Sequence, residues 1–392
     1  MFDDNTYPLA TSSWDDDEYV AIGEVIASDR FTMGPKVREF EEQFAEAFGS
    51  RHAVMVNSGS SANLIAIASA VLDDRQGLGP GDEILVPAVS WATTYFPLQQ
   101  YGLKLKFVDI DIDTLNMDLA LAEEAITPKT KGVFAVNLLG NPQDFDRLER
   151  LADKYGLIVW EDNCESMGAT FDGRYAGTFG QIGTFSTFFS HHISTMEGGM
   201  LLTNDEKLAQ MMVSLRAHGW TRELPSVNHV FNKTGNKFDD LFRFVLPGYN
   251  VRPLEMSGAL GIRQISKLPS ILAGRRENAE YFLKTFAQCP DIRTQKETGQ
   301  SSWFGFSLVL EGRLAGRRID VVQALSAAGI EARPIVAGNF TLNPVMKYLD
   351  ASVPRALPAA DKIHVDGLFV GNHHFPIHAQ IDKLYGVITD ML

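Results

Sequence analysis

The feature that most constrains the fold is a regular alternation of short apolar runs and amphipathic, helix-like runs between residues 52 and 162. The apolar runs lie at 53–56, 83–86, 105–108, 132–136 and 157–160, and the helix-like runs between them lie at 62–72, 94–101, 119–126 and 145–155. Short apolar strands that alternate with helices are typical of a parallel sheet covered on both faces. The pattern therefore predicts an α/β fold with a mostly parallel central sheet.

The pattern changes near Asn250, where a second region begins. Residues 254–286 keep helical spacing over a long stretch that Pro269 is expected to interrupt. Beyond it we expect a strand at 303–310, a helix at 318–328, a strand at 331–336 and a terminal helix at 381–392. We predict a large domain over residues 1–250 and a smaller C-terminal α/β domain over 251–392, linked by the long helix.

One further segment, residues 225–240, is polar and rich in Asn, Lys and Gly. We expect it to form a mobile loop or lid.

Charge and cysteine content exclude several classes of function. The chain of 392 residues has a net charge of −14, which argues against a nucleic-acid or anionic-membrane partner. Residues 1–5 lack the apolar core of a signal peptide, and no apolar run is long enough to span a bilayer, so we expect a soluble cytoplasmic protein. The two cysteines, Cys164 and Cys289, are too few for a four-cysteine iron–sulfur cluster in one chain.

The turn at residues 57–61, Asn-Ser-Gly-Ser-Ser, lies between a predicted strand and a predicted helix. Its small residues and the amide groups of the helix N-terminus suit a phosphate, to which Ser60 and Ser61 are placed to add hydroxyl donors. Ser186 is expected to offer a hydroxyl to the same phosphate. The alternative is a plain N-cap turn, in which serine is also favoured.

Two carboxylates and an aromatic residue follow strand ends, where α/β sheets place their ligands. Asp162 is suited to pair with a protonated pyridine nitrogen, although it is equally suited to cap the next segment. Glu165 is three residues further on and is expected to face the same site. Trp91 is suited to stack on a flat cofactor ring, and its alternative is a tryptophan packed in the core.

A histidine pair, His191 and His192, precedes a Glu-Gly-Gly turn. Adjacent side chains point in different directions, so we expect one imidazole in the site and one packed elsewhere. A neutral histidine is a good proton carrier near pH 7, whereas no third ligand stands at a spacing that favours a metal. His218, with Arg222 close by, is a second candidate near the site, and its alternative is a histidine that ends a helix before Gly219.

Taken together, these segments resemble the sugar aminotransferase family of fold-type I pyridoxal-phosphate enzymes. The resemblance rests on residues 31–35, 57–61, 87–94, 161–169, 183–199 and 249–253. It implies pyridoxal or pyridoxamine 5′-phosphate as the cofactor and a homodimer with shared active sites. The roles that it implies are phosphate contacts for Gly59, Ser60, Ser186 and the partner's Asn250, ring stacking for Trp91, the pyridine nitrogen for Asp162, and the ring hydroxyl for Glu165.

The chain departs from most of this family at His191, where the family has a lysine that holds the cofactor as a Schiff base. A histidine cannot do so, and the cofactor is then bound non-covalently. The resemblance is to a histidine-bearing dehydratase branch, which implies C3 dehydration of a GDP-linked 4-keto-6-deoxy sugar in dideoxysugar (colitose) and O-antigen biosynthesis, with L-glutamate as amino donor and ammonia as a product. His191 is then the general base, and His218 and Arg222 are candidate substrate contacts. A related branch on CDP-linked sugars adds an iron–sulfur cluster, which two cysteines cannot build.

Two alternatives remain at this point. One is an aminotransferase with a relocated lysine, which would produce a 4-amino sugar. The other is a cofactor-binding protein that has lost its catalytic activity. The retained Asp162, Glu165, Trp91 and Ser186 favour the dehydratase, because a decayed site has no reason to keep all of them.

Overall fold

The computed structural model describes residues 6–392 of the chain. Residues 1–5, to which the signal-peptide argument applied, lie outside this range. Within the described part, no helix has the length and apolar character that a membrane span requires.

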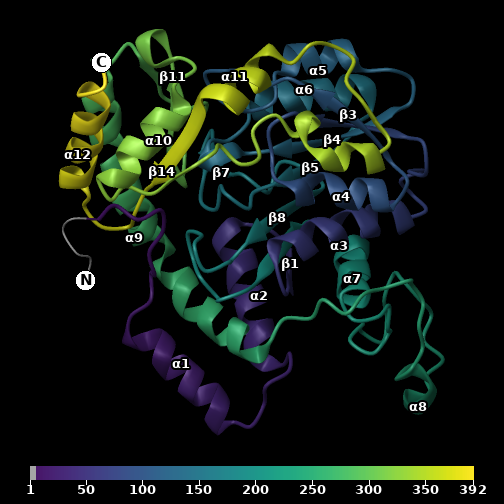
Figure 1. Ribbon diagram of the computed structural model, residues 1–392. Helices are drawn as coiled ribbons and strands as arrows, with labels where there is room; N and C mark the ends of the chain where they lie inside the picture. The colour runs from purple at the N-terminus through teal and green to yellow at the C-terminus, as the bar shows by residue number, and fades with distance from the viewer. Residues whose placement is uncertain (1–5) are drawn as a thin grey trace.

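The centre of the molecule is an eight-stranded sheet (Figure 1). Its strands, in spatial order, are β1 (His52–Val56), β9 (Gly199–Thr203), β8 (Ile182–Ser186), β5 (Ile158–Asp162), β4 (Thr130–Val136), β2 (Glu83–Pro87), β3 (Lys104–Val108) and β13 (Ala351–Ser352). Only β9 runs antiparallel to its neighbours, β1 and β8. The prediction of a mostly parallel sheet is confirmed, and the carboxyl ends of β2, β4, β5 and β8 meet at one edge.

Helices cover both faces of this sheet, as predicted. On one face lie α3 (Gly59–Leu72), α4 (Ala92–Gln100) and α7 (Glu206–Leu215), and on the other lie α5 (Leu119–Ala125), α6 (Phe145–Tyr155) and α2 (Pro35–Phe48). Strand β2 shows why the run Ile84–Val86 is continuously apolar: Ile84 and Val86 pack into one core and Leu85 into the other. A strand buried on both faces has no polar side to alternate with.

The long helix α9 (Glu255–Phe286) differs from its prediction, because it passes through Pro269 without a break. A proline inside a helix removes one backbone hydrogen bond. Leu268 and Leu272, on either side of it, are buried in the core that α9 shares with α2, and this packing holds the helix together. At its start, the Glu255 carboxylate accepts hydrogen bonds from the amides of Lys36 and Val37, at the first turn of α2.

The C-terminal region contains a second, antiparallel sheet. Its strands, in spatial order, are β10 (Ile292–Arg293), β11 (Gly305–Leu310), β14 (Gly367–Gly371) and β12 (Ala332–Arg333), and α10 (Arg318–Ala327) and α12 (His378–Thr389) pack on it. The strand expected at 331–336 is limited to β12, because Pro334 has no N–H to donate to the sheet. Tyr7 also belongs to this core, and its hydroxyl donates to the Gly371 carbonyl. The domain boundary at residue 250 stays a prediction.

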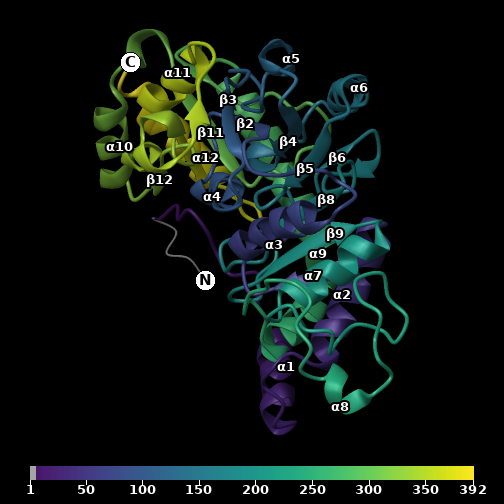
Figure 2. The same cartoon turned by 90° about the vertical axis from the view of Figure 1, so that its right-hand side faces the viewer.

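Several elements had no counterpart in the prediction. Among them are α1 (Asp16–Ala27), α2, α8 (Lys237–Asp240), α11 (Pro358–Asp366), the strands β9, β13 and β14, and the hairpin of β6 (Thr170–Phe171) and β7 (Arg174–Tyr175). Helix α1 begins with a capping box between Asp15 and Glu18. Helix α8 is a single turn inside the segment expected to be a loop. Figure 2 shows α1 and α8 at the end of the molecule away from the small sheet.

Candidate active site

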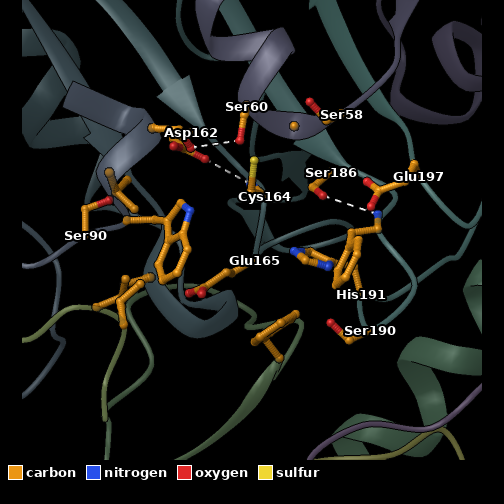
Figure 3. A pocket seen from close by; sticks show the side chains of 18 residues that line it. Ser58, Ser60, Ser90, Asp162, Cys164, Glu165, Ser186, Ser190, His191 and Glu197 are labelled. Atoms are coloured by element: carbon orange, nitrogen blue, oxygen red, sulfur yellow. Dashed lines mark hydrogen bonds between the residues drawn. The ribbon is translucent and has the colours of Figure 1, made fainter. Parts of the chain in front are cut away.

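A cavity of about 390 Å³ lies where the carboxyl ends of β2, β4, β5 and β8 meet the start of α3. Open α/β sheets bind their ligands at this position. Seven of the predicted site residues line it: Gly59, Ser60, Trp91, Asp162, Glu165, Ser186 and His191. Figure 3 shows Asp162, Glu165 and His191 pointing into the same space. We refer to it below as the His191 cavity.

The start of α3 forms one wall of the cavity. Ser58 is the N-cap and accepts a hydrogen bond from the Ser61 amide at 3.1 Å, so the capping role falls to Ser58 and Ser60 is left to line the cavity. Gly59 lies so close to its neighbours that a Cβ there would stand 2.7 Å from Cβ of Ser186 and 2.8 Å from Sγ of Cys164. The first amides of a helix have no partner within it, and they suit an anion.

Asp162 is buried at the end of β5 and held in one orientation by three donors. Its Oδ2 accepts from Nδ2 of Asn63 and Oγ1 of Thr94, each at 2.8 Å, and its Oδ1 accepts from the Cys164 amide at 3.1 Å. The segment that follows Asp162 is a turn rather than a helix, and the hydrogen bond from the Cys164 amide caps it, so both roles considered for Asp162 stay compatible with the structure. A fixed carboxylate at the floor of a cavity suits the protonated nitrogen of a pyridine ring.

Glu165 and Trp91 form further parts of the wall. The Glu165 carboxylate accepts from the Leu139 amide at 3.0 Å. Burial raises the pKa of Glu165 to about 7, the negative charge of Asp162 acts in the same direction, and the Leu139 amide opposes both. Trp91 is 59% exposed, so it is not packed in the core, and its indole is free to stack on a flat ring.

His191 lies between two aromatic rings, with centroid distances of 5.8 Å to Phe188 and 5.1 Å to Phe304. Burial and, secondly, the positive charge of Arg275 lower the pKa of His191 to about 4. The imidazole is therefore neutral near pH 7 and free to accept a proton. His192 is buried outside the cavity with a ring nitrogen 3.0 Å from the Ser302 carbonyl oxygen. The two histidines are thus separated into one site residue and one packed residue.

Three predicted site residues, His218, Arg222 and Asn250, do not line the His191 cavity. Arg222 and Asn250 line a different hollow of about 370 Å³, together with Trp220 and Arg252. The guanidinium groups of Arg222 and Arg252 lie 5.7 and 5.8 Å from the centre of the Trp220 ring, and Nε of Arg252 donates to Oδ1 of Asn250 at 3.0 Å. These four residues are called the Trp220 surface below.

His218 stacks on Trp220 with centroids 5.0 Å apart. It lies beyond the end of α7 in a left-handed conformation, with a φ of 63°. It does not end the helix, which closes at Leu215, and it contacts the Trp220 surface through the Trp220 ring without lining the hollow.

Sequence reasoning missed two residues beside His191. Phe304 lines the cavity, and Arg275 acts on the imidazole from α9. Both come from the C-terminal region, more than 80 positions away along the chain. No local motif marks either of them.

The model of the DegT/DnrJ/EryC1/StrS aminotransferase family matches residues 13–385. GDP-4-keto-6-deoxy-D-mannose 3-dehydratase of Escherichia coli O55:H7 is 54% identical over 384 residues, which are 97% of this chain and 99% of that protein.

Two crystal structures of GDP-4-keto-6-deoxymannose-3-dehydratase are similar over their full length. A histidine-to-asparagine variant with bound GDP-perosamine has a TM-score of 0.96 and 53% identity, and covers 98% of this chain and 100% of that one. A structure with a trapped PLP–glutamate geminal diamine has a TM-score of 0.96 and 54% identity, over 97% of this chain and 100% of that one.

Proposed function

Since this chain belongs to the DegT/DnrJ/EryC1/StrS aminotransferase family, we propose that it is a pyridoxal-phosphate-dependent 3-dehydratase of GDP-4-keto-6-deoxy-D-mannose. The observation that carries the proposal is the composition of the cavity wall. None of the described residues that line it is a lysine, and His191 is the group in it best suited to move a proton. A site of this kind favours elimination of a hydroxyl over completed amino transfer.

The residues of the cavity fit pyridoxal 5′-phosphate bound without a covalent link. Gly59, Ser60 and Ser186 would hold its phosphate, Asp162 its pyridine nitrogen, and Trp91 the face of its ring. When bound, such a cofactor supplies an electron sink for carbanion chemistry. Glu165 lies within the same wall and would contact the ring hydroxyl.

His191 would act first as a base and then as an acid. Its low pKa keeps the imidazole unprotonated at neutral pH, and it makes the imidazolium a strong acid once a proton has been taken up. That proton is then available to the departing C3 hydroxyl. Proton transfer by a positioned side chain typically contributes about 10²–10⁴-fold to a rate. L-Glutamate would supply the amino group that leaves as ammonia.

The charges of the cavity support the proposal that a second copy of the chain completes the site. Among its described lining residues there is no lysine or arginine, while Asp162, Glu165 and Glu197 are carboxylic acids. The cofactor phosphate and the nucleotide diphosphate are both anionic, so their counter-charges must come from elsewhere. We propose a homodimer in which the Trp220 surface of one subunit faces the His191 cavity of the other, with Asn250 at the phosphate and His218 and Arg222 toward the substrate.

The direct test is incubation with GDP-4-keto-6-deoxymannose, pyridoxal phosphate and L-glutamate. We expect ammonia and a 3-deoxy sugar, and no product when glutamate is omitted. An aminated sugar that keeps its C3 oxygen would identify an aminotransferase instead. Bound cofactor without turnover would favour a non-catalytic protein. Borohydride should trap no lysine adduct in the resting protein.

A further inference from the structure

Arg275, on α9, is a buried cation without a counter-ion. It is 6% exposed, and within the described chain it makes no ion pair with a carboxylate. Its Nη1 donates to two carbonyl oxygens, of Trp303 at 3.2 Å and Phe304 at 3.1 Å, and its buried Nε has no acceptor. Arg216, which is equally buried, pairs with Glu41. Burying a charge without a partner is costly, so the exception at Arg275 calls for a reason.

The surroundings of Arg275 are imidazoles. After burial, its positive charge is the next cause that lowers the pKa of His191, His192, His373 and His374. A fixed cation disfavours a second positive charge nearby, so each of these rings is held in its neutral form. Of the four, only His191 lines the cavity.

The two carbonyl groups that Arg275 holds belong to a turn that forms the cavity wall. Trp303 adopts a left-handed conformation with a φ of 48°, which is rare for a residue other than glycine. Phe304 follows it, and its ring packs against both His191 and His192. Two hydrogen bonds from one guanidinium therefore fix the turn that places Phe304 on the imidazole of His191.

We propose that Arg275 is a positioning residue for the dehydration step, because its two hydrogen bonds fix the turn that holds Phe304 against the imidazole of His191 and its unpaired charge is buried against the same turn. The kinetic consequence rests on the function proposed above, whereas the effect on His191 does not. The other ionisable groups around His191 are Asp162, Cys164, Glu165 and Glu197 of the cavity wall and the neighbouring His192. Arg275 is the cation that reaches His191 from α9.

The experiment is an NMR titration of protein with isotopically labelled histidine, in which the His191 signal is assigned by its loss in His191→Asn. In Arg275→Gln, which removes the charge but keeps an amide donor, we expect the His191 midpoint to rise by about one pH unit or more. In Arg275→Lys, which keeps the charge, it should stay close to the wild-type midpoint. Thermal unfolding checks that each variant is folded.

Arg276 provides the matched control. It is the next residue of the same helix, and its guanidinium donates to the carbonyl oxygens of Ser301 and Gly168. Arg276→Gln should leave the His191 midpoint in place. An unchanged midpoint in folded Arg275→Gln, or an equal rise in Arg275→Lys, would overturn the proposal. If Arg275→Gln does not fold, Arg275→Met, which also removes the charge, is titrated in its place, and a wild-type midpoint at or above the ordinary 6.5 contradicts the proposal.

The rate of dehydration gives an independent measurement. The acid limb of the pH profile should move to higher pH in Arg275→Gln, because His191 would then be protonated over a wider range. If the chain proves not to be a dehydratase, this profile cannot be recorded, but the titration still decides the role of Arg275. A failure of the proposed function can therefore be told apart from a failure of the proposed role of Arg275.

Discussion

The His191 cavity and the Trp220 surface have opposite chemical characters. The cavity is walled by aromatic rings, hydroxyls and carboxylic acids, and its histidine is held neutral. The Trp220 surface places two guanidinium groups over one indole and has an amide beside them. The cavity contains groups that can carry protons, whereas the two guanidinium groups of the surface suit an anion, with the Glu223 carboxylate lining the same hollow. Neither alone is a complete site for an anionic nucleotide sugar, and the proposed dimer brings them together.

The largest expected effect comes from removing the base from the cavity. His191→Asn should reduce ammonia release by at least about 10²–10⁴-fold, because the asparagine amide cannot accept the proton. Cofactor binding, followed by absorbance, should remain. His229→Asn is a suitable control, since this histidine is exposed and its ring lies 3.5 Å from the Glu206 carboxylate, away from the cavity wall. Product formation at the wild-type rate in His191→Asn would remove this residue from its proposed role.

A smaller effect tests whether the two regions act across subunits. His191→Asn and the double variant Asn250→Ala/Arg252→Ala should each be inactive or weak alone. When they are co-expressed with different tags, half of the dimers are mixed and each has one intact shared site, so about a quarter of wild-type activity should return.

The negative control for this experiment is the co-expression of His191→Asn with Asp162→Asn. Both substitutions lie in the His191 cavity, so a mixed dimer has no intact site and activity should not return. If mixed dimers of His191→Asn with Asn250→Ala/Arg252→Ala form but stay inactive, the Trp220 surface is not part of the active site.

The smallest effect concerns the pH dependence of stability. Burial raises the pKa of Glu165 to about 7 from 4.5, so the folded protein holds a proton that the unfolded chain releases. The free energy of unfolding should therefore fall as pH rises from about 4.5 to about 7, by on the order of 1–3 kcal/mol for this group. Glu165→Gln should make the fall shallower in urea unfolding measured at pH 5 and pH 8. Glu161, whose pKa burial also raises to about 7, leaves a residual slope. An unchanged slope would show that Glu165 ionises normally.

The sheet and its covering helices were predictable because their physics is local. A run such as Ile84–Pro87 is apolar throughout, and Asp162 follows another such run at a strand end, where a polar residue points to a ligand. Several site residues could be named for the same reason, since each follows a strand in an α/β pattern. Their roles toward a cofactor stay predictions.

What could not be predicted depends on distant packing. Pro269 does not interrupt α9, because Leu268 and Leu272 are buried against elements far away in the sequence. Phe304 reaches the cavity through a turn whose conformation Arg275 fixes, and no spacing in the chain relates these residues to His191. The same applies to the Trp220 surface, whose members are brought together by a fold-back of the chain between residues 220 and 252.

Because α9 is unbroken, the direction in which the Arg275 side chain points is set by the position of Arg275 along the helix. Glu255 anchors one end of this rod to α2, and Arg275 stands 20 residues further on, which corresponds to about 30 Å along the axis. Each residue of an α-helix advances the direction of its side chains by about 100°. One inserted residue between these two points would turn the guanidinium away from the imidazole, although every contacting side chain kept its identity. The length of α9, as well as its sequence, thus sets the charge that His191 meets.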